Sequence, residues 1–223
     1  MTMSMGMTQS LKPEMSLRQT LKAEQRQEMV ASMTLSIRLE LVAALHNGPN
    51  GTTTIRPMAS CVHCGRNLTP LEIIKGFNND PNDFSTACTG CKRRFDPTLV
   101  WHDNVGSIEL PFYCNMQTQS RLAGLETLSP VDFKAKEPAL YHSAIVHNGT
   151  LKAAFQRLNI EYSFVEITDP AIKVKQFLGR LPDTIIAEVS GLKLAVVRRL
   201  RKKYRIKACT QRVMLEQAQE SVA

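Results

Sequence analysis

Residues 178–206 read LGRLPDTIIAEVSGLKLAVVRRLRKKYRI, and this segment decides how the C-terminal third of the chain folds. Asp183, which follows Pro182, is expected to cap a first helix over TIIAEV. A Ser-Gly turn then ends at Gly191, and a second helix runs from about residue 192 or 193 to Tyr204. The pattern therefore predicts two short helices that pack across a tight turn.

The spacing of small and apolar residues in this segment fits a helix-turn-helix unit. Such a unit needs a small residue where the helices touch, a glycine four residues later, and apolar anchors on both helices. Ala187 and Gly191 meet the first two needs. The expected anchors are Ile186, Leu192, Val197 and Leu200. Ser190 stands before the glycine, where an apolar residue is usual.

The second helix is strongly basic. Residues 194–207 hold seven Lys and Arg and no acidic residue, in a chain whose formal net charge is +8. A positive balance of this kind favours acidic partners, meaning nucleic acid or an anionic membrane surface. Side chains near the start of the helix are expected to face base edges in the major groove; they are Lys193, Leu194, Ala195 and Arg198. Phosphate contacts are expected from Arg199, Arg201, Lys202, Lys203, Arg205 and Lys207.

Four cysteines form two pairs. CVHCG contains Cys61 and Cys64, CTGCK contains Cys88 and Cys91, and 23 residues separate the pairs. Each Cys-x-x-Cys turn can bring two thiolates onto one ion, and two such turns make a tetrahedral four-sulfur site, which zinc prefers. A closed shell of four thiolates leaves no position for a reacting water, so Zn²⁺ is expected to be structural. Redox-active disulfides are the alternative.

The neighbours of these cysteines are expected to play ordinary roles. Gly65 and Gly90 ease the positive φ that such turns often need. His63, His102 and Cys114 are interpreted as residues of the lobe and not as further ligands. Because two Cys-x-x-Cys pairs occur without an export signal, we expect a reducing compartment in which the thiols bind metal.

The sequence predicts a mainly α fold with a small β zinc-ribbon lobe. The expected parts are a disordered segment 1–13, a long amphipathic helix 14–46 with a possible break at 33–36, a linker 47–57, a zinc ribbon 58–115, a helical module 120–163, a helix-turn-helix region 164–207 and a polar tail 208–223. In the helical module, Pro138 marks a helix start, Asn148-Gly149 a stop, and Thr150 the N-cap of the next helix.

The long helix 14–46 is expected to mediate self-association or a contact with RNA polymerase, or simply to pack against the zinc lobe. The chain has no run of about 18 apolar residues and no apolar signal core. We therefore expect a cytoplasmic protein with no membrane contact.

The segment 178–206 resembles a short helix-turn-helix found in bacterial and phage proteins, of the form Leu-Gly-x-x-Pro-Asp-x-x-Ile-Ala, a glycine turn and a basic helix. Arg205-Ile206 stands where a Gly-Ile end is usual. Residues 137–160, EPALYHSAIVHNGTLKAAFQRLNI, are similar to helical repeats that accompany homing endonucleases. This likeness rests on Pro138, Leu140, Tyr141, Ala144, Asn148, Gly149, Ala154 and Ile160. The cysteine segment looks like a generic zinc ribbon. Together the resemblances imply DNA binding and no nuclease.

Catalytic motifs do not emerge from the sequence. It contains no phosphate loop, no Gly-x-Ser-x-Gly and no His-Glu-x-x-His, and Asp80 and Asp83 in NNDPND are interpreted as turn residues. We expect a protein that is not an enzyme and that binds double-stranded DNA as a transcriptional regulator. The alternatives are a structural protein bound to RNA or a large assembly, an accessory protein of a mobile element, and a charged helix on a protein–protein module.

Overall fold

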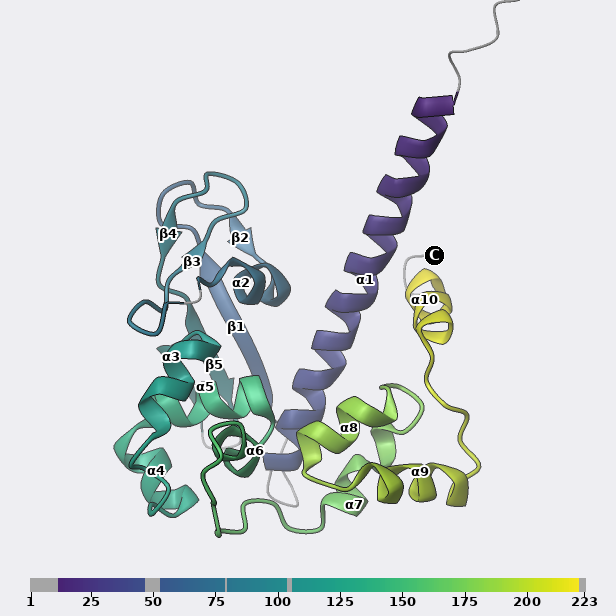
Figure 1. Ribbon diagram of the computed structural model, residues 1–223. Coiled ribbons are helices and arrows are strands. Elements are labelled where there is room, and N and C mark those ends of the chain that lie inside the picture. The colour runs from purple at the N-terminus through teal and green to yellow at the C-terminus, as the bar shows by residue number, and fades with distance from the viewer. Residues whose placement is uncertain (1–11, 47–52, 79, 104–105, 221–223) are drawn as a thin grey trace, which may run out of the picture.

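The computed structural model describes residues 12–46, 53–78, 80–103 and 106–220. The fold is mainly helical with a small antiparallel β lobe, as the sequence predicts. Helix α1 (Lys12–His46) runs between the β lobe and the C-terminal helices, and both contact it (Figure 1). The predicted disorder of residues 1–13 falls almost wholly outside the described residues.

Helix α1 is continuous, so the predicted break near residues 33–36 is wrong. Inside that stretch the Thr34 hydroxyl donates to the carbonyl of Val30 at 2.6 Å, which satisfies the hydroxyl within the helix. The two halves of α1 differ in their surroundings. Residues 23–28 are exposed, whereas the second half buries an apolar set against the rest of the fold. This set is Ile37, Leu39, Leu41, Val42, Ala43 and Leu45.

The stretch Ala23–His46 of α1 is long and apolar enough to cross a membrane, judged by length and composition. The sequence expectation missed it because Arg38 and Glu40 interrupt the apolar run. A single helix of this kind is weak evidence, since the core helix of a globular fold passes the same test. Nearly all apolar side chains between Ile37 and Leu45 are buried inside the protein, which fits a core helix.

The β lobe contains one small sheet in the order β2-β1-β5-β6 and the short pair β3-β4. Its elements are β1 (Thr54–Ser60), β2 (Asn67–Leu68), α2 (Pro70–Gly76), β3 (Thr86–Ala87), β4 (Arg94–Phe95), β5 (Thr98–His102) and β6 (Ser107–Pro111). Ile55 of β1 lies opposite Trp101 of β5, and both are buried on the face that meets the helices. The Trp101 ring lies 4.3 Å from the ring of His142.

The predicted linker 47–57 is wrong for residues 54–57, which belong to β1. Residues 54–58 pair with β5, which is distant in the sequence, and this pairing makes them a strand. The Gly, Pro and Asn cluster just before them is the pattern that predicted a linker. Residues 47–52 lie outside the described part of the chain.

A layer of helices covers the buried face of the sheet. It consists of α3 (Asn115–Leu122), α4 (Pro130–Lys136), α5 (Pro138–Asn148) and α6 (Leu151–Gln156). The predicted start and end of α5 and the predicted N-cap of α6 are confirmed. Pro138 begins α5, Gly149 ends it with φ +86°, and the Thr150 hydroxyl caps α6 by accepting from the amide of Ala153 at 2.9 Å. Nearly every side chain of α5 is buried, so this helix is the centre of the layer.

The C-terminal elements are α7 (Pro170–Lys173), the 3₁₀ helix η1 (Val174–Phe177), α8 (Asp183–Ser190), α9 (Leu194–Lys203) and α10 (Gln211–Glu220). The expectation of a polar tail over 208–223 needs correction. Helix α10 returns to α1, where Met214 is only 2% exposed and its sulfur lies 3.6 Å from the Thr34 hydroxyl oxygen. The buried side chain of Met214 therefore docks this segment on α1.

Polar side chains of α1 fasten the end of α5. The Arg38 guanidinium donates to the carbonyls of Val146 and, at 2.8 Å, His147, and the His46 ring lies 2.8 Å from the carbonyl of Gly149. These carbonyls belong to the last turn of α5, where the helix itself supplies no donors. Burial lowers the pKa of Arg38, so the hydrogen bonds compensate a desolvated charge.

Two glycines with the same backbone angle allow a matched test of close packing. A Cβ on Gly149 would lie 2.5 Å from a backbone oxygen of Val189 on α8, whereas a Cβ on Gly124, also at φ +86°, would meet nothing within 4 Å. Gly124→Ala should cost about 1 kcal/mol through backbone strain alone. Gly149→Ala should cost about 3 kcal/mol or more, because α8 must also move. Urea unfolding measures both, and equal losses would contradict the close approach.

Acidification should destabilise the fold through three histidines. Burial lowers the pKa of His46, His142 and His147 to about 4, 3 and 4. The unfolded value is about 6.5, so the folded state favours the neutral rings. Their contribution is complete above pH 6.5 and is lost as the pH falls toward 4. Between pH 7.5 and 5.5 the free energy of unfolding should fall by about 1.4 kcal/mol per histidine.

Urea unfolding at the two pH values tests this expectation. His142→Phe removes one of the three rings and should reduce the pH dependence by about a third. A stability that does not vary between pH 7.5 and 5.5 would show that the three rings titrate normally.

Candidate metal centre and basic helix

The four paired cysteines meet at one end of the β lobe. The sulfurs of Cys61, Cys64, Cys88 and Cys91 all lie within 4.8 Å of one another. The closest pairs are Cys61 with Cys91 at 3.5 Å and Cys64 with Cys88 at 3.7 Å. These separations exceed a disulfide bond of about 2.05 Å and suit four ligands around one ion. The structure thus brings together every predicted metal ligand.

The two cysteine turns have the same backbone geometry. In the first, the amide of Cys61 donates to Arg66 at 2.9 Å and the amide of Gly65 donates to Cys61 at 2.8 Å. In the second, Cys88 donates to Arg93 at 2.9 Å and Lys92 donates to Cys88 at 3.0 Å. Such a turn needs positive φ at its fifth residue. Gly65 supplies +72°, but the second turn uses Lys92 at +63°.

The prediction for Gly90 is therefore wrong as to its role. Its φ is not positive; instead its amide donates to the Cys88 sulfur at 3.3 Å. A Cβ at Gly90 would also lie 3.3 Å from the Arg66 side chain. The glycine thus lets the first turn approach the second.

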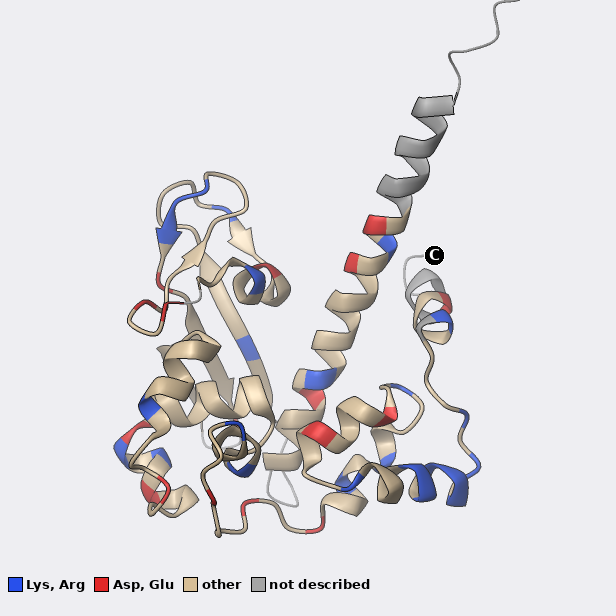
Figure 2. Ribbon diagram, viewed as in Figure 1, with Lys and Arg blue, Asp and Glu red and all other residues tan. Residues whose placement is uncertain are grey.

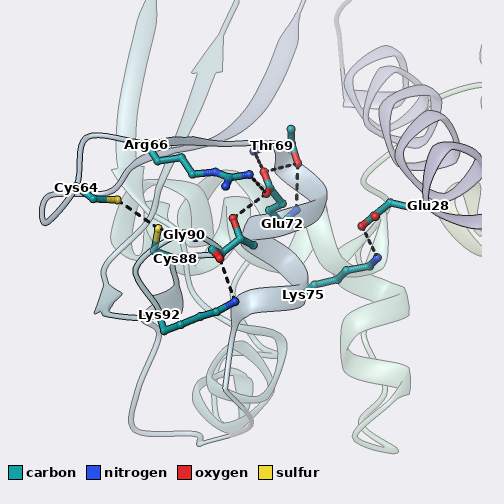
Figure 3. A network of polar contacts seen from close by, with 10 residues as sticks. Glu28, Cys64, Arg66, Thr69, Glu72, Lys75, Cys88, Gly90 and Lys92 are labelled. Carbon is teal, nitrogen blue, oxygen red and sulfur yellow. Dashed lines mark hydrogen bonds and ion pairs between the residues drawn. The ribbon is translucent and has the colours of Figure 1, made fainter. Parts of the chain in front are cut away.

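Glu72 of α2 stabilises the lobe beside the sulfurs (Figure 3). Its carboxylate accepts from the backbone amide of Thr69 at 2.8 Å, from the hydroxyl of Thr89 at 2.8 Å and from Arg66 at 3.1 Å. The bond from the Thr69 backbone contributes most to lowering the pKa of Glu72. Because Arg66 ends the first cysteine turn and Thr89 lies within the second, one carboxylate connects both turns to α2.

The thiols of Cys64 and Cys88 have different pKa values. The backbone amides of Cys91 and Gly90 lower the pKa of Cys88 to about 6. At Cys64 the Arg66 backbone acts to lower the pKa, but the neighbouring thiols outweigh it and raise the pKa to about 11. Four thiolates this close repel one another unless a cation lies between them. A divalent ion would remove that repulsion, so the donor set fits a soft, tetrahedral metal.

Nearby candidate ligands are used elsewhere. The Cys114 thiol donates toward the carbonyls of Asp80 and Asp83, and Cys114 caps α3 by accepting from the amide of Gln117. The Asp83 carboxylate accepts from the amides of Ser85 and Asn78, as the turn interpretation of NNDPND expects. The rings of His63 and His102 lie outside the cluster of sulfurs.

Helices α8 and α9 pack across a three-residue turn. Gly191 begins it in the left-handed conformation, at φ +69°, and α9 starts at Leu194. Of the predicted anchors, Ile186 and Val197 are fully buried, and Leu192 and Leu200 are partly buried.

The predicted cap of α8 is wrong. Asp183 does not cap the helix; both its carboxylate oxygens accept from Nε of Arg201, at 3.0 and 2.9 Å. Arg201 was predicted to contact phosphate, but its side chain is only 15% exposed and also donates to the carbonyl of Ile206. This arginine therefore holds α9 against α8 and does not belong to the exposed basic face.

The remaining basic side chains point outward, and Figure 2 shows them gathered along α9. The exposed residues are Lys193, Arg198, Arg199, Lys202, Lys203, Arg205 and Lys207, while Leu194 is partly buried. Within the described part of the chain, the side chains of Arg198, Arg199 and Lys202 have no hydrogen-bond or ion-pair partner. Residues 170–207 hold eleven Lys and Arg against two Asp and Glu, a balance of +9, so the rest of the chain is nearly neutral.

The end of α9 explains the unusual Arg205-Ile206. Arg205 adopts φ +57°, where glycine is usual, and its amide donates to Lys202 while that of Ile206 donates to Arg201, both at 3.0 Å. This pattern is a Schellman cap. Ile206 then packs against Gly179, where a Cβ would lie 2.6 Å from the Ile206 side chain.

Sequence reasoning missed two residues at this face. Lys175 of η1 and Tyr204 at the end of α9 lie together, with the Lys175 ammonium 4.7 Å from the centre of the Tyr204 ring. The pair joins segments 29 positions apart, so no local pattern indicates it. The available signal in the sequence was an aromatic residue, Tyr204, among five basic residues between positions 201 and 207.

No family model matches the chain, and no curated protein or solved structure matches it. The chemistry of the cysteine cluster and of the basic helix therefore has to indicate the function.

Removal of one sulfur should abolish metal binding. Cys88→Ser should lose the bound divalent ion, measured by elemental analysis of purified protein. It should also lose about 3 kcal/mol or more of the free energy of unfolding, because the two turns are no longer held together. Cys209→Ser, outside the cluster, is the matched control and should keep the ion. Unchanged metal content in Cys88→Ser would contradict the site.

Proposed function

We propose that the protein binds double-stranded DNA sequence-specifically as a transcriptional regulator, with a structural zinc ion in the four-cysteine centre. The observation that carries this proposal is the row of exposed, unpartnered arginines and lysines on α9, a helix held to α8 by a tight turn. A helix about ten residues long with one such face has the size and charge to enter the major groove.

The two ends of α9 would serve different contacts. Lys193, Leu194 and Arg198 lie near its N-terminal end, where a recognition helix meets base edges. Arginine can bind guanine through two hydrogen bonds, and an apolar side chain can meet a thymine methyl group. The later basic residues suit the phosphates on either side of the groove; they are Arg199, Lys202, Lys203, Arg205 and Lys207.

Zinc fits the donor set best, because four thiolates in two turns form a closed tetrahedral shell. When bound, the ion would hold the turns together and supply no reactive position. Cys61, Cys64, Cys88 and Cys91 would ligate it, and Glu72 would support the turns through Arg66 and Thr89. We therefore propose a cytoplasmic, non-enzymatic protein that has no membrane contact.

The exposed part of α1 is proposed to mediate self-association or a polymerase contact. Its second half packs inside the fold, whereas residues 23–28 are exposed and can meet a partner. The alternative function is a structural role on RNA or a large assembly, or an accessory role in a mobile element. It is favoured by the number of side chains suited to phosphates, since RNA can be bound by such contacts alone.

Selection from a random-duplex pool near physiological salt tests the proposal. We expect one enriched motif, bound at least about 10³-fold more tightly than random DNA. A palindromic motif would indicate a dimer. Retention without enrichment, lost steeply as salt rises, would favour the RNA or assembly alternative. No retention would contradict nucleic-acid binding altogether.

Two neighbouring arginines should give different defects. Arg198→Ala should lower affinity for the selected site about tenfold or more and relax the preference at one base pair. Arg199→Ala should weaken binding to all duplexes and reduce the salt dependence by about one charge. Arg212→Ala, on α10 and 88% exposed, is the matched control. Identical behaviour of all three variants would contradict the assignment of α9.

A further inference from the structure

Tyr204 ends α9 between two lysines from different elements. The Lys175 ammonium of η1 lies 4.7 Å from the centre of the Tyr204 ring, and that of Lys203 lies 5.8 Å from it. All three side chains are exposed, and Tyr204 is 37% exposed. The cluster therefore gathers two positive charges and a phenol hydroxyl at the surface.

Within the described residues, neither Lys175 nor Lys203 forms an ion pair with a carboxylate. Each ammonium instead lies within 6 Å of the centre of the Tyr204 ring, which attracts cations. The nearby Lys173 differs, since it donates to the carbonyl of Leu45 at 2.8 Å. Two charges of like sign beside one ring, with no counter-ion among the described residues, favour the binding of an anion.

We propose that Lys175, Lys203 and Tyr204 form a binding site for a phosphate group. The two lysines supply point charges and the phenol supplies a hydrogen bond, all of which are common phosphate contacts in protein–DNA complexes. Resting on the proposed function, the site would hold one backbone phosphodiester of duplex DNA.

The position of the site fits that role. Tyr204 follows Leu194 by ten residues, so it lies about 15 Å further along α9. The major groove is only about 12 Å wide. With the start of α9 at the base edges, Tyr204 therefore reaches the phosphates that border the groove. Lys175 extends this contact to η1, an element outside the basic helix.

Fluorine NMR of protein labelled with 3-fluorotyrosine tests the site directly. The chain has four tyrosines, and Tyr141 and Tyr162 are buried. Spectra of Tyr204→Phe identify the Tyr204 resonance by its disappearance. Titration with inorganic phosphate should shift this resonance and leave those of the buried tyrosines in place. Lys175→Gln and Lys203→Gln should each weaken the phosphate affinity at least threefold, whereas Lys136→Gln on α4 should not. An unchanged Tyr204 resonance would overturn the site.

Duplex binding gives an independent readout. Lys175→Gln should reduce the slope of log affinity against log salt by about one and leave the sequence preference unchanged. Lys136→Gln should match the wild type in both respects. If the wild type binds duplex and neither variant nor phosphate titration shows an effect, the site is wrong and the proposed function stands. If phosphate shifts Tyr204 but no duplex binds, the site stands and the DNA function fails.

Discussion

The packing of the second half of α1 is the constraint on which the rest of the structure depends. Its apolar residues are buried between β1 and α2 on one side and α8 and η1 on the other. The same stretch carries Arg38, whose buried charge is tolerated because two carbonyls at the end of α5 accept its hydrogen bonds. Helix α1 thus packs against both the β lobe and the C-terminal helices. The charge of Arg38 also supplies hydrogen bonds to the carbonyls at the end of α5.

Helices α8 and α9 are held together by one arginine of the basic segment, which is mostly buried. Arg201 pairs with Asp183 and reaches the carbonyl of Ile206, so it fixes α9 against α8 and supports the end of α9. Because Asp183 is neutralised by Arg201, the exposed charges of α9 meet little opposing charge. Arg201 is mostly buried and its basic neighbours are exposed, and this difference decides which side chains can meet a polyanion. A count of charges along the sequence does not reveal which arginine is mostly buried.

Local signals in the sequence predicted the parts of the fold that local chemistry controls. The paired cysteines, the start of α5 at Pro138, its end at Gly149 and the cap at Thr150 each depend on residues within one turn, and all appear in the structure. The failures involve distant partners. Strand β1 starts early because β5 pairs with it, Arg201 turns inward because Asp183 lies eighteen residues before it, and α10 docks through Met214. Whether the candidate sites bind zinc and DNA remains a proposal.

Apolar packing, and not ion pairs, must couple the cysteine lobe to the basic unit. Glu28 and Lys75 connect the lobe to α1, and Glu40 and Arg180 connect α1 to the loop before α8. All four side chains are about half exposed, so each pair contributes only about 0–1 kcal/mol. Burial of Ile37, Leu41 and Leu45 contributes about 1.5–3 kcal/mol per side chain. The lobe and the C-terminal helices are therefore held in one fold mainly by the buried apolar side chains of α1.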